Sequence, residues 1–144
     1  MKYRLDKSRV FMTLAKGDDI NKTFESFAKF KGIGCAWLNG IGAIENPEIG
    51  YYSLEDKSYH RKLFEGEYEL TSLIGNITLK EGKPFSHTHI TFGDTEYRVF
   101  GGHLFNAKIT AAGEFIIQLG SEDINREMNS GIGLPLWCLE ESLG

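Results

Sequence analysis

The chain has 144 residues, of which 41% are hydrophobic and 25% charged, and its formal net charge is −4. This length and composition exclude a disordered chain and indicate one soluble globular domain that needs neither a disulfide nor a metal to fold. The acidic balance also counts against a nucleic-acid-binding protein, whose surface usually carries an excess of lysine and arginine.

The first quarter of the chain is predicted to hold a strand followed by a helix. Residues 3–14 carry apolar side chains at every second position, which is typical of a strand with one buried face: Val10, Met12 and Leu14. A turn at 17–19 follows, with candidates for a helix N-cap. The apolar residues that come next fall on one helical face: Ile20, Phe24, Phe27 and Ala28. Gly32 is a natural stop for this helix.

The rest of the chain reads as strands separated by turns. Extended runs are predicted at 33–38, 50–54, 57–64, 67–79, 87–92, 97–100, 103–110 and 114–119. We expect a turn at 112–113, a helical turn at 124–128 and a short apolar tail at 136–139. Many strands with one good helix favour an α+β fold with a mainly antiparallel sheet.

Cysteines and targeting signals add little. Cys35 and Cys138 lie in apolar runs without CxxC spacing, so we expect buried free thiols. Charged residues follow Met1, and no run approaches the roughly 18 apolar residues of a membrane span. We therefore expect a cytoplasmic protein with no membrane segment. The basic residues near the start, Lys2, Arg4, Lys7 and Arg9, are interrupted by Asp6 and are interpreted as a solvated edge.

Three of the four histidines lie close together: His87 and His89 in one run, and His103 after a Gly-Gly pair. If residues 87–92 form a strand, the two-residue spacing points the first two rings to the same face, and the next strand can bring the third alongside. Three imidazoles commonly hold zinc with one coordination position open, and nickel, copper or iron also accept imidazole. The sequence therefore predicts a metal site, most simply for zinc, at these three residues.

The open position leaves the chemistry undetermined, and no pattern identifies a catalytic residue. A zinc-bound water can ionise near neutral pH and act as a nucleophile, with Thr91, Asp94 or Glu96 as candidates for a base or for hydrogen bonds to the ligands. The alternative is that the three histidines are ordinary residues on a sheet face.

A cupin barrel also uses an HxH pattern, but this chain fits it poorly. The spacings from Gly82 to His87 and from His89 to Glu96 do not match, and no Pro-x-Gly precedes His103.

Five segments together resemble the plant and prokaryote conserved (PPC) domain, and they occur in that family's order: 11–20 (FMTLAKGDDI), 40–44 (GIGAI), 66–70 (GEYEL), 86–89 (SHTH) and 101–104 (GGHL). They span about Val10 to Leu119, so residues 1–144 are identified as a single PPC-like domain. The resemblance implies a compact sandwich in which one main helix packs on the sheet, and a homotrimer. It also implies zinc at His87, His89 and His103, as in prokaryotic members that keep these histidines.

In plants this domain follows AT-hook motifs in nuclear DNA-binding proteins, where it mediates assembly. This chain has no Arg-Gly-Arg-Pro core, and Glu67 stands where the plant hexapeptide has arginine. A DNA-binding or regulatory role is therefore implied by family analogy only, and we expect little direct DNA binding.

Three functions remain open at this point. The first is a homotrimeric zinc-binding module with an assembly or regulatory role. The second is a small metal-dependent enzyme, of hydrolase or lyase type, or a ligand binder. The third is a purely structural role, in which the metal only links strands or subunits.

Overall fold

The computed structural model describes residues 1–139, which form nine strands and one helix. The strands are β1 (Lys2–Asp6), β2 (Arg9–Ala15), β3 (Ala36–Ser53), β4 (Ser58–Leu63), β5 (Glu67–Lys80), β6 (Lys83–Gly93), β7 (Val99–Leu119), β8 (Asn125–Asn129) and β9 (Leu134–Cys138), and the helix is α1 (Ile20–Lys31). Within these residues no helix has the length and apolar character needed to cross a membrane.

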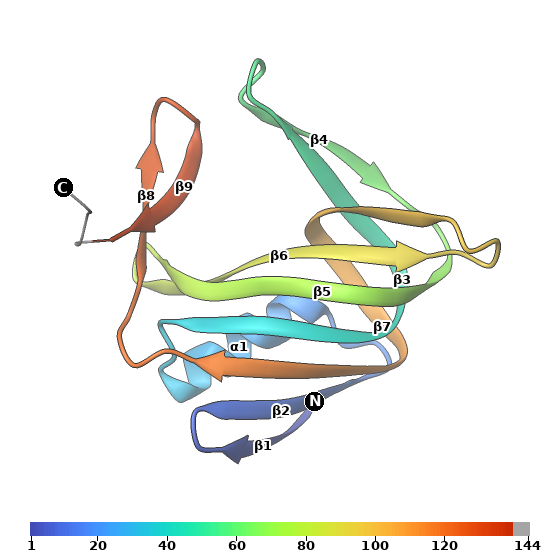
Figure 1. Ribbon diagram of the computed structural model, residues 1–144, viewed down its shortest axis with the longest axis horizontal. Coiled ribbons are helices and arrows are strands. Elements are labelled where there is room, and N and C mark those ends of the chain that lie inside the picture. Colours follow the sequence, from blue (N-terminus) through green and yellow to red (C-terminus); the bar gives the residue numbers. More distant parts are fainter. Residues whose placement is uncertain (140–144) are drawn as a thin grey trace.

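The strands form one sheet in the order β1-β2-β7-β3-β5-β8-β9, with β4 on β3 and with β6 paired to both β5 and β7 (Figure 1). Every pairing is antiparallel except the short parallel pair of β5 and β8. Because β3 pairs with both β5 and β7, and β6 pairs with the same two strands, these four strands close a ring. The α+β class with a mainly antiparallel sheet and one packed helix is confirmed.

Helix α1 begins and ends where the sequence predicts. The Asp19 side chain accepts a hydrogen bond from the Lys22 backbone N–H (3.1 Å), and Gly32 has the left-handed conformation (φ 65°) that ends many helices. The predicted apolar face is buried against the sheet: Ile20, Phe24, Phe27 and Ala28. The ring of Phe24 packs edge-on against Phe115 of β7, with the two centroids 5.1 Å apart. The helix thereby covers one face of the sheet, behind the strands in Figure 1.

Three sequence-based expectations are corrected at the level of local structure. Residues 3–14 form two strands rather than one, because the chain reverses at Lys7, whose φ is 55°. Strand β7 runs through 112–113 without a turn. Gly113 serves close packing there, since a Cβ at this position would lie 2.6 Å from the Phe115 ring. Residues 125–128 belong to strand β8 rather than to a helical turn, because they pair with β9 and the first two also pair with β5.

The predicted burial of the two cysteines is also wrong. Cys35 is only half-buried, and Cys138 is exposed because the hairpin of β8 and β9 lies at the edge of the sheet. The tail predicted at 136–139 is part of this hairpin, whose strand β9 ends at Cys138.

Two arms extend from the same side of the sheet, one formed by the hairpin β8–β9 and the other by β4 and the end of β3 (Figure 1). Hydrogen bonds connect them: the Tyr52 hydroxyl donates to the Ile132 carbonyl (2.7 Å), and the Lys57 ammonium donates to the Ser130 carbonyl (3.2 Å). Each arm supplies one side chain that contacts the histidine cluster.

Candidate metal centre

The fold brings His87, His89 and His103 together on neighbouring strands. His87 and His89 alternate with buried Thr88 along β6, so both rings leave the same face, and His89 is the register partner of His103 on β7. One ring nitrogen of each histidine lies within 4.8 Å of the others, and the ring centroids are 5.1 to 5.4 Å apart. The sequence singled out these three residues, and a single chain assembles them.

The Gly-Gly pair before His103 has a packing role. A Cβ at Gly101 would lie 2.8 Å from the Ile90 carbonyl oxygen, and a Cβ at Gly102 would lie 2.9 Å from the Gly50 carbonyl oxygen. Both separations are too short for a side chain, so glycine lets β7 pass close between β6 and β3.

The nitrogen positions fit a tetrahedral metal. The Nε2 atoms of His87 and His89 are 3.3 Å apart. Two zinc–nitrogen bonds of about 2.0–2.1 Å at the tetrahedral angle would separate their nitrogens by about 3.3–3.4 Å. In addition, the Nδ1 atom of His103 is buried and has no hydrogen-bond partner within the described part of the chain. A buried polar atom without a partner is costly, and a metal would satisfy it.

The surroundings keep these imidazoles neutral, which is the form that binds a metal. Burial lowers the pKa of His87 to about 4, with further contributions from the charge of Arg126 and from His89. Burial likewise lowers the pKa of His103 to about 4, assisted by the two other histidines and by Arg61. The pKa of His89 is lowered by burial as well.

Helix α1 fixes the two histidine strands from the opposite face of the sheet. The Thr88 hydroxyl, which lies between the two β6 histidines, donates to the Asn21 side-chain oxygen (2.7 Å), and the Asn21 amide donates to the Leu104 carbonyl next to His103 (3.1 Å). One side chain thus ties together the residues adjacent to all three rings.

The arm of β3 and β4 covers His103 with aromatic rings. Tyr59 of β4 lies against the His103 ring with a centroid separation of 4.8 Å, and Phe105 contacts it from β7 at 4.9 Å. These rings supply much of the burial that depresses the His103 pKa.

The hairpin of β8 and β9 contributes Arg126, a residue that the sequence analysis did not single out. Its guanidinium donates to the Thr78 hydroxyl (2.7 Å), the Pro135 carbonyl (2.9 Å) and the Asn76 side-chain oxygen (2.7 Å), and lies 3.5 Å from the Nδ1 atom of His87. No motif surrounds Arg126, and its segment was interpreted as a helical turn, so nothing in the sequence connected it with the histidines.

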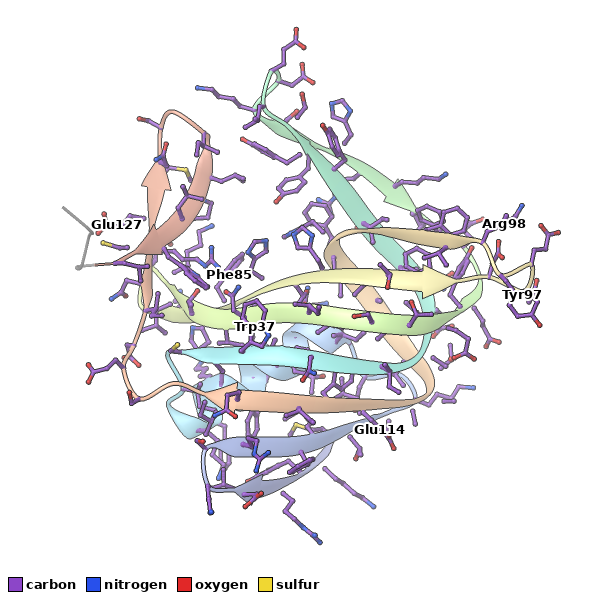
Figure 2. All side chains as sticks on the ribbon, viewed as in Figure 1. Trp37, Phe85, Tyr97, Arg98, Glu114 and Glu127 are labelled. Atoms are coloured by element: carbon purple, nitrogen blue, oxygen red, sulfur yellow. The ribbon has the colours of Figure 1, made fainter. Side chains whose placement is uncertain are left out.

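The acidic and hydroxyl residues suggested by the sequence are engaged elsewhere. Asp94 and Glu96 bind Arg98 in the turn between β6 and β7, and Thr91 shares a hydrogen bond with Thr71 of β5 (2.9 Å). Figure 2 shows Arg98 at the opposite end of β6 from Phe85, which lies near the hairpin of β8 and β9. The suggestion that these three residues serve the histidine site is not supported.

A cavity of about 520 Å³ opens beside the cluster and is lined by His87, His103 and Arg126; we call it the histidine cavity. Its remaining walls are apolar residues together with polar groups of α1 and β5, including Phe85, Leu136, Asn21, Glu25 and Lys80. A space of this size is typical of small-molecule sites, where a few polar groups stand among apolar walls.

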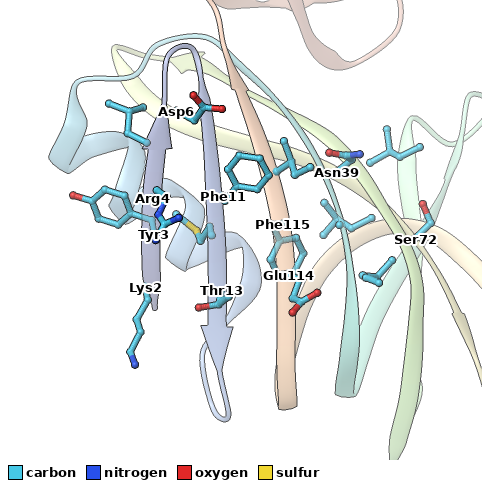
Figure 3. Close-up of a pocket in the computed structure, with 17 residues that line it drawn as sticks. Lys2, Tyr3, Arg4, Asp6, Phe11, Thr13, Asn39, Ser72, Glu114 and Phe115 are labelled. Atoms are coloured by element: carbon cyan, nitrogen blue, oxygen red, sulfur yellow. The ribbon is translucent and has the colours of Figure 1, made fainter.

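A second hollow, of about 1180 Å³, lies on the sheet face opposite α1; we call it the sheet-face groove. Figure 3 shows side chains of β1, β2, β7, β3 and β5 along it, among them Phe11, Asn39 and Glu114. Several large apolar side chains stay exposed here: Phe11, Ile41, Ile74 and Ile116.

Comparisons with known proteins agree with this architecture. A structure of a plant- and prokaryote-conserved (PPC) protein from Pyrococcus horikoshii is 38% identical, covers 98% of this chain and 97% of its own, and has a TM-score of 0.86. The metal-containing protein AF0104 from Archaeoglobus fulgidus is 36% identical, with coverage of 96% and 97% and a TM-score of 0.85. A "putative DNA binding protein" from Bacteroides thetaiotaomicron is 32% identical, with coverage of 95% and 96% and a TM-score of 0.91.

No match was found among curated proteins. The model of the Plants and Prokaryotes Conserved (PCC) domain matches residues 1–121, which include all three clustered histidines. This chain belongs to the Plants and Prokaryotes Conserved domain family.

Proposed function

We propose that the protein is a metal-binding module that holds one zinc ion per chain through His87, His89 and His103. The observation that carries this proposal is that one ring nitrogen of each histidine lies within 4.8 Å of the others, with the Nε2 atoms of His87 and His89 3.3 Å apart. The metal-containing relative from Archaeoglobus supports it. Zinc is preferred because neutral imidazole suits it and because three ligands leave its fourth position open.

The decisive measurement is metal content by mass spectrometry on protein without an affinity tag. We expect about one zinc per chain in the wild type and a loss of zinc in His87→Ala. The matched control is His60→Ala, because the fourth histidine has a side chain 63% exposed and pairs with Asp56 away from the cluster. Equal zinc in all three proteins, or none in the wild type, would contradict the proposal.

We further propose that the chain assembles as a homotrimer, as the family resemblance implies, and that copies meet through the sheet-face groove. Apolar side chains at this face, such as Ile41 (56% exposed) and Phe11 (44% exposed), gain most from being covered. Light scattering should return three times the chain mass, and a stable monomer would contradict the assembly.

A regulatory role near DNA rests on the names of relatives, and we propose that it runs through assembly rather than through direct DNA contact. The net charge is −4, and the lining of the groove includes the acidic residues Asp6 and Glu114 as well as the basic residues Lys2 and Arg4. A gel-shift series at rising salt should show no binding at micromolar protein. Binding that weakens steeply with salt would contradict this.

A second candidate function is a metal-dependent ligand binder or a small hydrolase or lyase. The histidine cavity favours it, because a metal that only stitched strands together would not need an adjoining space of about 520 Å³. One acidic residue of the cavity, Glu25, accepts hydrogen bonds from the Ser86 backbone N–H and hydroxyl, so it is engaged as a structural group.

A further inference from the structure

Arg126 is a half-buried cation that has no acidic partner among residues 1–139. All three of its close hydrogen bonds go to neutral groups, on Thr78, Pro135 and Asn76. No carboxylate among residues 1–139 forms an ion pair with it. The guanidinium also lies over the rings of Phe85 (5.4 Å) and Trp137 (6.0 Å), but neither ring carries a negative charge to balance it. A partly desolvated charge with only neutral partners favours an anionic ligand.

The charge imbalance continues along the wall of the histidine cavity. Its charged residues are two acidic and three basic ones. Asp19 pairs with Lys22 (3.3 Å), which leaves one negative charge on Glu25 and two positive charges, on Lys80 and Arg126. The wall therefore carries one net positive charge before any metal is bound. Three neutral imidazole ligands would leave a divalent metal both of its charges, which makes the cavity still more attractive to an anion.

Metal binding would also change what Arg126 faces. Without a metal, a guanidinium nitrogen of Arg126 lies 3.5 Å from Nδ1 of His87, which is a long hydrogen bond. Because a guanidinium can only donate, Nδ1 must be the acceptor in this contact. A metal on Nε2 of a neutral His87 places the ring proton on Nδ1, so two donors would then face each other. An acceptor oxygen at the side of this pair, about 2.8 Å from each nitrogen, would accept from both.

From the unbalanced guanidinium, the donor pair and the mixed walls of the histidine cavity, we infer that the cavity binds a small organic carboxylate, with its oxygens on Arg126 and its apolar body against Phe85 and Leu136. This inference rests on the proposed metal site, because the metal turns His87 into a donor. The net positive charge of the wall, to which a bound metal adds, favours an anion, and the planar guanidinium fork matches a carboxylate. A free inorganic phosphate would leave the apolar walls unused.

Benzoate is a suitable probe, with benzamide as its neutral analogue of the same shape. We would titrate both into zinc-loaded wild-type protein by calorimetry, and benzoate also into Arg126→Gln, Arg126→Lys and the control Arg98→Gln. Arg98 is the matched control because it is exposed and pairs with Asp94 at the far end of β6. Zinc per chain and circular dichroism would be recorded for every sample.

We expect benzoate to bind the wild type and Arg98→Gln alike, to bind Arg126→Gln at least tenfold more weakly, and to bind Arg126→Lys with intermediate affinity. Benzamide should bind at least tenfold more weakly than benzoate. Chelation of the zinc should weaken benzoate binding to the wild type. Unchanged binding in Arg126→Gln, equal binding of benzamide, or no benzoate binding to zinc-loaded protein would overturn the inference.

The two proposals fail in different ways. A wild type that takes up no zinc refutes the metal site, whatever benzoate does. A wild type that holds one zinc per chain but does not bind benzoate refutes the carboxylate site alone. Binding of inorganic phosphate without binding of benzoate would also refute it, since the apolar walls would then have no role.

Discussion

The histidine cavity and the sheet-face groove differ in what they lack. The groove is the larger of the two, at about 1180 Å³ against about 520 Å³. Side chains of regular strands line it, and several large apolar ones among them are exposed to solvent. Within residues 1–139, the cavity contains a buried imidazole nitrogen without a hydrogen-bond partner and a guanidinium without a counter-charge. An apolar surface needs covering, whereas unsatisfied polar atoms need a ligand, so size alone does not identify the site of chemistry.

The largest effect should come from placing a charge in the groove. Ile41→Lys puts an ammonium where copies are proposed to meet, and burying it unpaired would disfavour the trimer. The monomer should tolerate the change, because the cross-strand neighbour of Ile41 is Glu114. We expect light scattering to show a fall from trimer to monomer mass, with zinc per chain unchanged.

The control for this variant is Ile41→Val, which keeps the surface apolar and should stay trimeric. A lysine variant that keeps the trimer mass would show that the groove is not the contact between copies. If the lysine variant lost both the trimer and its zinc, the groove and the histidine cavity would depend on each other. Assembly and metal binding would then not be separate properties of the two regions.

Zinc removal should have the next largest effect. A ligand present at about a thousand times its dissociation constant stabilises the folded state by about 4 kcal/mol, which for a chain of this size corresponds to about 10 °C in Tm. We therefore expect a chelator to lower the wild-type Tm by about this amount. His103→Ala should respond little, since one of three ligands is missing.

The control for chelation is His60→Ala, which should lose as much stability as the wild type when zinc is removed. A wild-type Tm that does not move on chelation would rule out a stabilising metal at this site.

The sequence predicted the histidine cluster well because its geometry is local. A two-residue spacing on a strand determines the relative direction of His87 and His89, and the next strand along the chain can bring His103 beside them. The Gly-Gly pair itself lies within β7. Helix α1 was equally predictable, because Asp19, Gly32 and the spacing of four apolar residues all point to the same boundaries.

Arg126 could not be predicted, for a physical reason. Its place in the site depends on a parallel pairing of only two register positions between β5 and β8, and on hydrogen bonds to residues about 50 positions earlier in the chain. Long-range pairing of a short edge strand leaves no periodic signal. The passage of β7 through Gly113 was missed because glycine marks both turns and close packing. The reversal at Lys7 was missed because no glycine or proline marks it.

Acid should lower the free energy of unfolding of the zinc-free protein, because two histidines of the cavity become protonated when the chain unfolds. Burial holds the pKa of His87 and His103 at about 4, below the unfolded value near 6.5. Between these values the unfolded chain binds more protons, so stability is lost as pH falls from about 6.5 to 4. We expect a Tm decrease on the order of 5 °C over this range.

The comparison for the acid effect is His87→Gln, measured with chelator present. It removes one of the two depressed groups, so its Tm should depend less on pH in the same window. An identical pH profile for the two proteins would show that these histidines titrate normally in the folded state.

The smallest effect should come from Asn21, and it tests whether the back of the sheet helps to aim the rings. Asn21→Ala removes the acceptor for the fully buried Thr88 hydroxyl and the donor to the Leu104 carbonyl. Leaving a buried hydroxyl unsatisfied costs about 1–3 kcal/mol, and loss of such outer contacts typically weakens metal binding about 10- to 100-fold. Lys22→Ala, an exposed neighbour on the same helix, should change neither quantity.

Asn21→Asp separates the two roles of this side chain. It keeps the acceptor for Thr88 but loses the donor to Leu104, so it should recover part of the zinc affinity if the β6 rings are held through Thr88. If Asn21→Ala instead unfolds more easily while its zinc affinity equals that of the wild type, the strands alone place the three imidazoles. In that case the cavity would owe its geometry to the Gly-Gly passage of β7, where a Cβ at either glycine would approach a neighbouring carbonyl oxygen to within 3 Å.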